Sequence, residues 1–276
     1  MTFSTDWFAF EVDRTESVAE VRLIGPGKHN AMGPEFWREL PLLFAELEAD
    51  EKVRAVVLTG SGMNFSVGLD LSAMRPDFDA VLGDGSFAAP RTRFHHTLTR
   101  MQDAITAVAE FRKPVVAAVQ GACLGGGLDL IAAADIRYAA LDARFSIREV
   151  KVAIVADVGS LQRLPAIIGD GALRELAFTG KEIGTGQAKS IGLVNEIFPD
   201  ADAARAAAHA TAREIAANPP LVVQGIKEVL NHDRRAAVAA GLRYVAAWNA
   251  AFLPSEDLAE GLRAVAEGRP AHFTGR

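Results

Sequence analysis

The stretch KPVVAAVQGACLGGGLDLIAAADIRYAALDARFSIREVKVAIVADVGSLQRLP, residues 113–165, organises the rest of this chain. Its apolar run 115–119 predicts a buried strand, the glycine-rich segment 121–127 predicts a turn, and the alanine- and leucine-rich segment after it predicts a helix. A strand, glycine turn and helix in this order bring backbone N–H groups and a helix N-terminus to one point. The stretch therefore predicts a site for an electron-rich group.

Three acidic side chains follow this turn in otherwise apolar surroundings. Asp129 lies just inside the predicted helix, and Glu149 and Asp157 come after it. An unpaired charge is costly in an apolar environment, so we expect each acid either to be paired or to take part in chemistry.

The whole chain restricts the class of protein. Its 276 residues suffice for one α/β domain with a smaller appendage. No apolar run reaches the roughly 18 residues that span a bilayer, and the N-terminus lacks a signal pattern, so we expect a cytoplasmic protein without membrane insertion. The single cysteine, Cys123, excludes an internal disulfide framework and a cysteine-based zinc site. A formal charge of −6 argues against a nucleic-acid partner.

The order of predicted elements indicates a repeat. Residues 8–24 predict an antiparallel hairpin, and the run 53–58 predicts a buried strand that again precedes a glycine turn. Two copies of strand plus glycine turn suggest a coiled repeat of small sheet-and-helix units. The segment 76–93 has no clear period, so it predicts a loop or mobile flap over a site.

Beyond residue 200 the character of the chain changes. Alanine-rich amphipathic patterns predict helices at 201–217, 221–231 and 234–251, and a last helix at 255–267 with Ser255 as its N-cap. We therefore expect a core over residues 1–200 and a helical C-terminal module over 201–276.

The two glycine turns suggest one function together. Val67-Gly68-Leu69 and Gly125-Gly126-Gly127 each follow a predicted strand. Each turn could supply one N–H donor to a carbonyl oxygen that becomes negative during a reaction, and such a donor is worth about 3 kcal/mol in the barrier. The alternative is that both are ordinary turns at strand ends.

These residues carry a family resemblance. The motifs FSVGLDLSAM (65–74), GACLGGGLDL (121–130), GKEIGTGQAKSIGLVNEIFP (180–199) and SEDLAEGLRAVAEGRPAHFTG (255–275) resemble the crotonase (enoyl-CoA hydratase/isomerase) superfamily over essentially the full length. The resemblance implies an α/β fold, a crotonase-like spiral of repeated ββα units with a helical C-terminal module. It also implies an acyl-CoA thioester substrate, no cofactor beyond the coenzyme A of that substrate, no metal, and a homotrimer or hexamer.

The resemblance assigns binding residues as well. It implies that the backbone N–H groups of Leu69 and Gly126 form an oxyanion hole for the thioester oxygen. Residues implied to contact the CoA ester are His29, Ala31, Val67, Gly68, Leu69, Asp70, Leu71 and Gly126. We do not expect His29 to be a general base, because nothing near it in sequence matches a catalytic triad. Asp70 and Asp135 are expected to bond the backbone near the turns.

The acids distinguish reactions within the family. Asp129 and Glu149 stand where hydratases carry two glutamates that activate water, so the first acid is one methylene shorter here. REVKVAIVADVGSLQRLP (148–165) resembles the dienoyl-CoA isomerase branch, in which an aspartate at the position of Asp157 faces the substrate. Moving a proton along a diene requires an acid and a base at separate points. We expect Glu149 near the α-carbon and Asp157 near the distal end.

Other interpretations stay open at this point. Asp129 is expected to orient or tune the pair, and Asp157 could instead cap a helix before Gly159-Ser160. The chain could be a 2-enoyl-CoA hydratase of fatty-acid β-oxidation, or a catalytically silent acyl-CoA-binding scaffold. The acyl chain length, the pathway, the oligomer and the direction of the proton transfer are also open.

Overall fold

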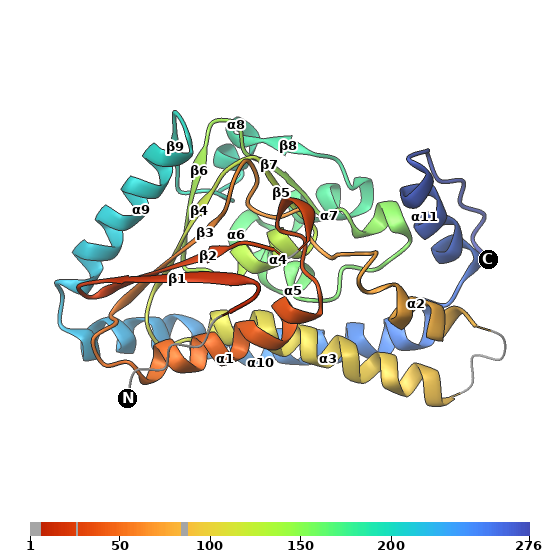
Figure 1. Cartoon of the computed structure of the whole chain (residues 1–276), viewed down its shortest axis with the longest axis horizontal. Coiled ribbons are helices and arrows are strands. Elements are labelled where there is room, and N and C mark those ends of the chain that lie inside the picture. The colour runs from red at the N-terminus through yellow and green to blue at the C-terminus, as the bar shows by residue number, and fades with distance from the viewer. Residues whose placement is uncertain (1–6, 26, 84–87) are drawn as a thin grey trace.

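A computed structural model describes residues 7–25, 27–83 and 88–276 as an α/β protein (Figure 1). The strands are β1 (Phe10–Thr15), β2 (Val18–Leu23), β3 (Ala55–Gly60), β4 (Val115–Val119), β5 (Ala122–Leu124), β6 (Ile136–Ala140), β7 (Arg144–Ser146), β8 (Ile183–Gly184) and β9 (Glu196–Phe198). The α-helices are α1 (Pro34–Ala49), α2 (Arg75–Leu82), α3 (Ala88–Glu110), α4 (Gly126–Ala132), α5 (Ser160–Arg163), α6 (Pro165–Ile168), α7 (Asp170–Thr179), α8 (Thr185–Ser190), α9 (Ala201–Ala216), α10 (Pro220–Phe252) and α11 (Glu256–Glu267). The 3₁₀ helices of the described residues are η1 (Lys28–Asn30) and η2 (Glu149–Val152).

The larger sheet has the order β1-β2-β3-β4-β6-β9. β1 and β2 pair antiparallel, which confirms the predicted hairpin, and the remaining neighbours pair parallel. Both faces of this sheet are covered, which explains its nearly continuous apolar strands. In β3, Val56 and Leu58 pack into the main core, whereas Ala55 and Val57 pack on the opposite side.

Helix α9 covers that opposite side of the sheet (Figure 1). Its buried residues recur every four positions and are all alanine: Ala204, Ala208, Ala212 and Ala216. Since alanine has a small side chain, the helix can lie close across β3, β4 and β6. Asp200 caps the helix, because its carboxylate accepts a hydrogen bond from the N–H of Ala203 at 2.8 Å.

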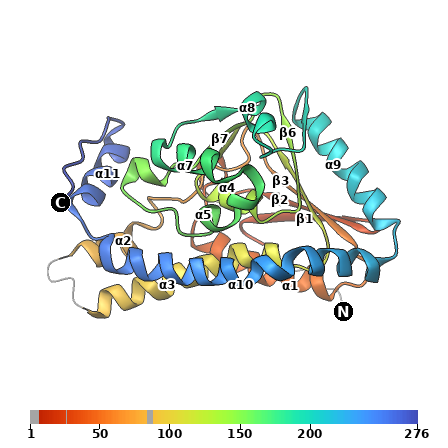
Figure 2. The same ribbon diagram turned by 180° about the vertical axis from the view of Figure 1, so that it is seen from behind.

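Helices α1, α3 and α10 form the other layer, which both views show as a row beneath the sheet (Figures 1 and 2). Residues 221–231 and 234–251 were predicted as two helices, and that prediction is wrong, because α10 is continuous. No proline or glycine separates the two segments, and α3 packs against the helix. The side chain of Asn231, at the predicted break, donates to the carbonyl oxygen of Ala109 at 3.5 Å.

The prediction of a loop or flap over residues 76–93 is also wrong for the part of that segment that the structure describes. Helix α2 occupies its first part and α3 begins at Ala88, while residues 84–87 lie outside the described residues. Phe78 and Val81, one helical turn apart, are buried, and the ring of Phe78 lies 6.1 Å from that of Phe94. Tertiary packing of these few apolar side chains stabilises a helix that its weak sequence period did not indicate.

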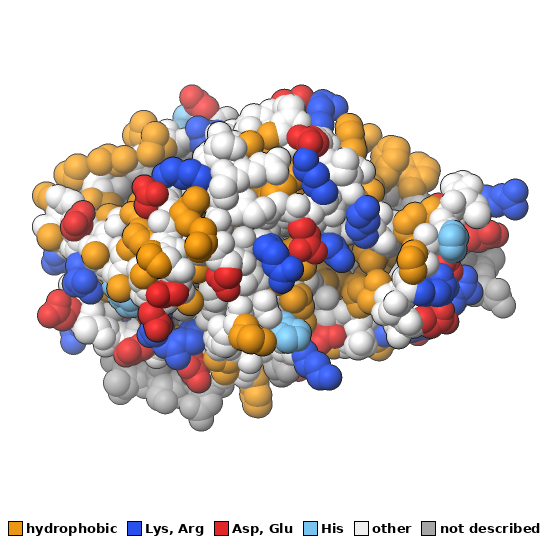
Figure 3. All heavy atoms as spheres, turned by 90° about the horizontal axis from the view of Figure 1, so that it is seen from above, with side chains coloured by type: hydrophobic (Ala, Val, Ile, Leu, Met, Phe, Trp, Pro, Cys, Tyr) orange, Lys and Arg blue, Asp and Glu red, His pale blue; other side chains and the backbone are white. Residues whose placement is uncertain are grey.

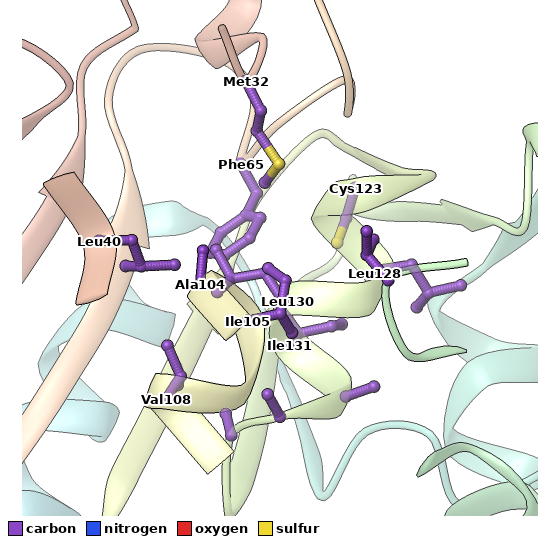
Figure 4. Close-up of a cluster of buried hydrophobic side chains, with 14 of the residues drawn as sticks. Met32, Leu40, Phe65, Ala104, Ile105, Val108, Cys123, Leu128, Leu130 and Ile131 are labelled. Carbon is purple, nitrogen blue, oxygen red and sulfur yellow. The ribbon is translucent and has the colours of Figure 1, made fainter. Parts of the chain in front are cut away.

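The predicted strand, glycine turn and helix over residues 115–132 are confirmed. The chain leaves β4, adds β5 to a small sheet of order β5-β7-β8, and enters α4 at Gly126. Every residue of α4 is buried. Leu130 and Ile131 of α4 lie beside Ala104 and Ile105 of α3, with Phe65 next to them (Figure 4). The surrounding core thus holds the start of α4 in a fixed place.

The remaining predictions on organisation have mixed outcomes. Ser255 caps α11 as expected, since its hydroxyl oxygen accepts from the N–H of Leu258 at 3.0 Å. The division of the chain at residue 200 stays a prediction. Among the described helices, none alone is long and apolar enough to cross a membrane; α10 and α11 pass that test only as a pair bent by 92°. Acidic and basic side chains intermingle on the face shown in Figure 3.

Candidate active site

The two glycine turns meet in space. An isolated β-bridge joins Ser66 to Cys123, and the N–H of Leu124 donates to the carbonyl oxygen of Ser66 at 3.0 Å. Gly68 has a φ of +87°, and a Cβ there would lie 3.1 Å from the nitrogen of Gly126. Only glycine fits so close an approach at that backbone conformation. The first turn therefore presents its backbone directly beside the start of α4.

At this junction the backbone N–H groups of Leu69 and Gly126 have no acceptor among the described residues. The neighbouring N–H groups are paired: that of Gly68 donates to Ser66 Oγ, that of Asp70 to the carbonyl of Met32, and that of Gly125 to the carbonyl of Ser146. Unpaired N–H groups are rare in protein interiors. Both Leu69 and Gly126 line one pocket, which therefore offers two donors to a bound acceptor.

The pocket holds about 830 Å³ of space, counting its open mouth. Much of its wall is apolar and comes from α1, α2, α3 and the first turn, including Trp37, Leu71, Phe78, Phe94, Leu98 and Met101. Such a wall suits a hydrocarbon chain, with the two donors at one point of the surface. In the part of the chain that the structure describes, no group of three or more His, Cys, Asp or Glu is suited to a metal ion.

Glu149, at the start of η2, also lines the pocket. A Cβ on Gly125 would lie 3.2 Å from Glu149 Oε1, so this carboxyl group lies beside the second glycine turn. Glu149 Oε2 is buried and has no hydrogen-bond partner in the described chain unless the neighbouring acid is protonated. Burial raises the pKa of Glu149 well above its usual range, and the charge of Asp129 raises it further.

Asp129 lies behind Glu149 and is fully buried. It is not among the residues that line the pocket. Its Oδ1 accepts a short hydrogen bond from the N–H of Ser160, so it caps the start of α5. Burial raises the pKa of Asp129 to about 6, although the bond from Ser160 opposes that change. The charge of Asp129 raises the pKa of Glu149, and two neighbouring buried carboxyl groups of this kind retain one proton between them near neutral pH.

Asp157 is the third acid and lines the same pocket as Glu149. Its Oδ2 accepts a hydrogen bond of 2.6 Å from Asn249 Nδ2 on α10. Burial raises the pKa of Asp157 to about 7, and the bond from Asn249 acts in the opposite direction. The capping alternative is not supported, because Gly159 is the N-cap of α5 and no side chain at that position bonds the helix.

Several predicted CoA-ester residues support the first turn from outside the pocket lining. The carbonyl oxygen of His29 accepts from the N–H of Val67, and His29 Nδ1 lies 3.0 Å from Asn64 Nδ2. Asp70 Oδ1 accepts from the N–H groups of Ser72 and Ala73, which confirms the expected backbone role. Ala31, Gly68, Asp70 and His29 do not line the pocket, whereas Val67, Leu69, Leu71 and Gly126 do. Contact of any of them with a CoA ester stays a prediction.

The sequence reasoning missed Asn249 and Gln102. Asn249 lies near the end of α10, 92 positions after the acid that it bonds, and Gln102 Nε2 on α3 donates to the carbonyl oxygen of Asp157 at 2.7 Å. Both side chains are buried. The sequence feature that could have indicated such a residue is a single amide side chain in an apolar helical segment, such as Asn249 within AAWNAAF at 246–252.

Comparisons with known proteins agree with this geometry. The family model described as enoyl-CoA hydratase/isomerase matches residues 13–276. The chain is 42% identical over 253 residues to the human protein named Delta(3,5)-Delta(2,4)-dienoyl-CoA isomerase, mitochondrial, across 91% of this chain and 77% of that protein. It is 40% identical to the Arabidopsis thaliana protein named Delta(3,5)-Delta(2,4)-dienoyl-CoA isomerase, peroxisomal, across 93% and 92%.

A solved structure supports the fold. The crystal structure of an enoyl-CoA hydratase/isomerase from Mycobacterium paratuberculosis is similar with a TM-score of 0.81 at 29% identity, across 92% of this chain and 97% of that one. The expected crotonase-like α/β fold is therefore confirmed. The expected cytoplasmic location is overturned, because the relatives above are named mitochondrial and peroxisomal.

Proposed function

This chain belongs to the enoyl-CoA hydratase/isomerase family and is an enzyme of it, and on that premise we propose that it isomerises 3,5-dienoyl-CoA to 2,4-dienoyl-CoA. One observation carries the proposal. Asp157, a buried acid with a pKa of about 7, lines the same pocket as Glu149 and the two unpaired N–H groups. A group with that pKa can hold or release a proton near neutral pH.

The thioester oxygen of the substrate accepts hydrogen bonds from the N–H groups of Leu69 and Gly126. Both donors belong to backbone that the junction of the two turns holds in place. When the α-proton leaves, negative charge develops on that oxygen, and preorganised donors stabilise it without rearrangement. Glu149 lies beside Gly125, so its carboxyl group is close to the carbon that bears this α-proton.

The reaction moves one proton from C2 to C6. Glu149 Oε1 takes the proton from C2, the electrons pass through the conjugated system to the thioester oxygen, and an enolate forms. The electrons then return, both double bonds move by one position toward the thioester, and protonated Asp157 gives its proton to C6. Glu149 ends protonated and Asp157 ionised, and exchange with solvent restores both. No oxidation state changes, so the proposed reaction needs no redox cofactor.

Asp129 influences the proton transfer by Glu149 and Asp157 without touching the substrate. Burial raises the pKa of both Glu149 and Asp129, so the two carboxyl groups keep one shared proton in the free enzyme. When that shared proton moves to Asp129, Glu149 is ionised and able to act as the base. The geometry also disfavours hydration as the main activity. Two acids must hold one water for that reaction, and Asp129 is bonded to Ser160 N–H outside the pocket lining.

Two substrates tested separately distinguish the activities. The purified protein is given a 3,5-dienoyl-CoA, and the conjugated 2,4-diene is followed by absorbance; a 2-enoyl-CoA is then given, and loss of its double bond is followed. We expect rapid diene formation and slow hydration. Fast hydration without diene formation would establish a hydratase, and tight binding without turnover of either ester would establish a silent scaffold.

We also propose that copies of this chain associate as a homotrimer or hexamer. Exposed apolar side chains recur along one side of α10, opposite its buried side: Val222, Ile226, Val229, Leu230, Tyr244, Trp248 and Phe252. Val229 is 75% exposed and Phe252 is 64% exposed. Exposed apolar side chains on one side of a helix are suited to burial against another copy.

A further inference from the structure

We propose that Asn249 is a positioning residue that selects which oxygen of Asp157 exchanges a proton with the substrate, an inference that rests on the proposed isomerase function. Asn249 Nδ2 donates to Asp157 Oδ2 at 2.6 Å. Among the described residues, no other residue donates a hydrogen bond to Oδ1, and Asp157 lines the pocket. Oδ1 is therefore the oxygen left to give or take the proton.

The orientation of the Asn249 amide is set by a second bond. Nδ2 also donates to the backbone carbonyl oxygen of Val155 at 2.8 Å. A carbonyl oxygen only accepts hydrogen bonds, so the NH₂ end of the amide must point toward it. Both hydrogens of Nδ2 are then used, one on Val155 and one on Asp157 Oδ2. Since Oδ2 receives a hydrogen bond, a proton on Asp157 is directed to Oδ1.

Gln102 fixes the backbone of the same acid from another helix. Its Nε2 donates to the carbonyl oxygen of Asp157 at 2.7 Å and to that of Leu242 on α10 at 2.9 Å. Gln102 is 5% exposed and Asn249 is 1% exposed, so water does not compete strongly for these bonds. The two amides hold the main chain and the side chain of Asp157 separately, which leaves the carboxyl group little freedom to rotate.

The Asn249 amide affects the pKa of Asp157 in the opposite direction to burial and to the acids around it. Asp129 on α4 and Glu149 on η2 are acids, and the charge of Asp129 raises the pKa of Asp157. Arg148 and Asp77 are the other charged residues of the pocket wall. The groups on α3 and α10 that bond Asp157 are the neutral amides of Gln102 and Asn249. The bond from Asn249 therefore opposes burial and the nearby acids.

The test replaces Asn249 by leucine, which has a similar shape and no donor. We expect the pH profile of kcat/KM for 3,5-dienoyl-CoA to move by about one pH unit toward higher pH on the limb that reports Asp157. Under the proposed roles this is the alkaline limb. We also expect kcat at the optimum to fall about tenfold because the carboxyl group loses its fixed orientation. KM should change little, since Asn249 does not line the pocket.

A matched control and a second variant make the result decisive. Asn231→Leu changes the same residue type 18 positions earlier on α10, about 27 Å away along the helix, and should leave the profile unchanged. Asn249→Asp keeps the side-chain shape if the leucine variant does not fold, and should raise the pKa of Asp157 further. A folded Asn249 variant with the wild-type pH profile would overturn this proposal. Absence of isomerisation in the wild-type protein would instead overturn the proposed function.

Discussion

Gly68 and Gly126 lie in direct backbone contact, although 58 positions separate them in the chain. A Cβ on Gly68 would lie 3.1 Å from the nitrogen of Gly126 and 2.7 Å from the carbonyl oxygen of Leu124. This contact fixes the relative positions of the two N–H groups that have no acceptor in the described chain. The geometry of the proposed oxyanion hole therefore depends on a position where no side chain fits.

Replacement of Gly68 by alanine should damage that geometry. The added methyl group would contact the backbone, and the φ of +87° disfavours any side chain, so the turn must shift. We expect kcat/KM for 3,5-dienoyl-CoA to fall by about 100-fold, the effect of displacing one oxyanion donor. Gly186→Ala is the control, because a Cβ there would have open space. Equal activity of the two variants would refute the proposed hole.

Glu149→Gln removes the proposed base while it preserves the shape of the side chain. We expect the isomerisation rate to fall by about 10³-fold or more, with affinity for a CoA ester retained. The variant should also be more stable than the wild type at pH 8, because one buried acid of a repelling pair is gone. Steady-state kinetics and urea unfolding measure both effects. Glu175→Gln, at an exposed ion pair, provides the control.

Asp129→Asn tests the role assigned to the buried acid. The charge of Asp129 raises the pKa of Glu149, so its removal should lower that pKa. We expect the limb of the kcat/KM profile that reports Glu149 to move about one unit toward lower pH. The amide oxygen can still accept from Ser160 N–H, so the fold should be kept. A profile that stays in place would show that Asp129 does not influence the base.

The free energy of unfolding should decrease as pH rises, because the pKa of Asp157 is raised in the native state. The native state keeps its proton up to about pH 7, whereas the unfolded chain loses it near 3.8. Between these values the native state binds more protons, so the free energy of unfolding falls with increasing pH. Asp157→Asn should remove about 4 kcal/mol of this decrease between pH 4 and pH 8. Urea unfolding across that range would contradict the account if both proteins had the same slope.

An acidic residue on the exposed face of α10 should weaken self-association. Ile226→Glu places a charge in the middle of the apolar side chains that we propose to be buried between copies. We expect light scattering after size-exclusion chromatography to show a smaller species than for the wild type. Leu42→Glu, at an exposed apolar residue of α1, is the control. A monomeric wild-type protein would exclude the proposed oligomer.

Local motifs were enough to predict much of the fold and the glycine junction. The turns around Gly68 and Gly126 need unusual backbone conformations or close contacts, and few residues other than glycine satisfy them. The regular apolar runs of β3 and β4 likewise indicated a sheet covered on both faces. Helix α2 was not predicted, because its stability comes from Phe78 packing near a residue of another helix.

The surroundings of the acids were not predictable in the same way. That Asp129 bonds Ser160, and that Asp157 bonds Asn249, depends on how distant segments pack. Spacing along the chain placed the acids in order but did not show that Asp129 lies outside the pocket lining while the other two acids line the pocket. An isolated asparagine in a helix has many ordinary uses, so its partner becomes apparent only in three dimensions.

The most direct measurement compares wild type, Asp157→Asn and Asp200→Asn with 3,5-dienoyl-CoA as substrate. Asparagine serves equally well at the N-cap of α9, so the last variant controls for loss of an acid elsewhere. We predict rapid formation of the conjugated 2,4-diene by wild type and Asp200→Asn. Asp157→Asn should fold, bind the ester and form the diene about 10³-fold more slowly. Turnover by Asp157→Asn at the wild-type rate would contradict the central claim that this residue transfers the proton.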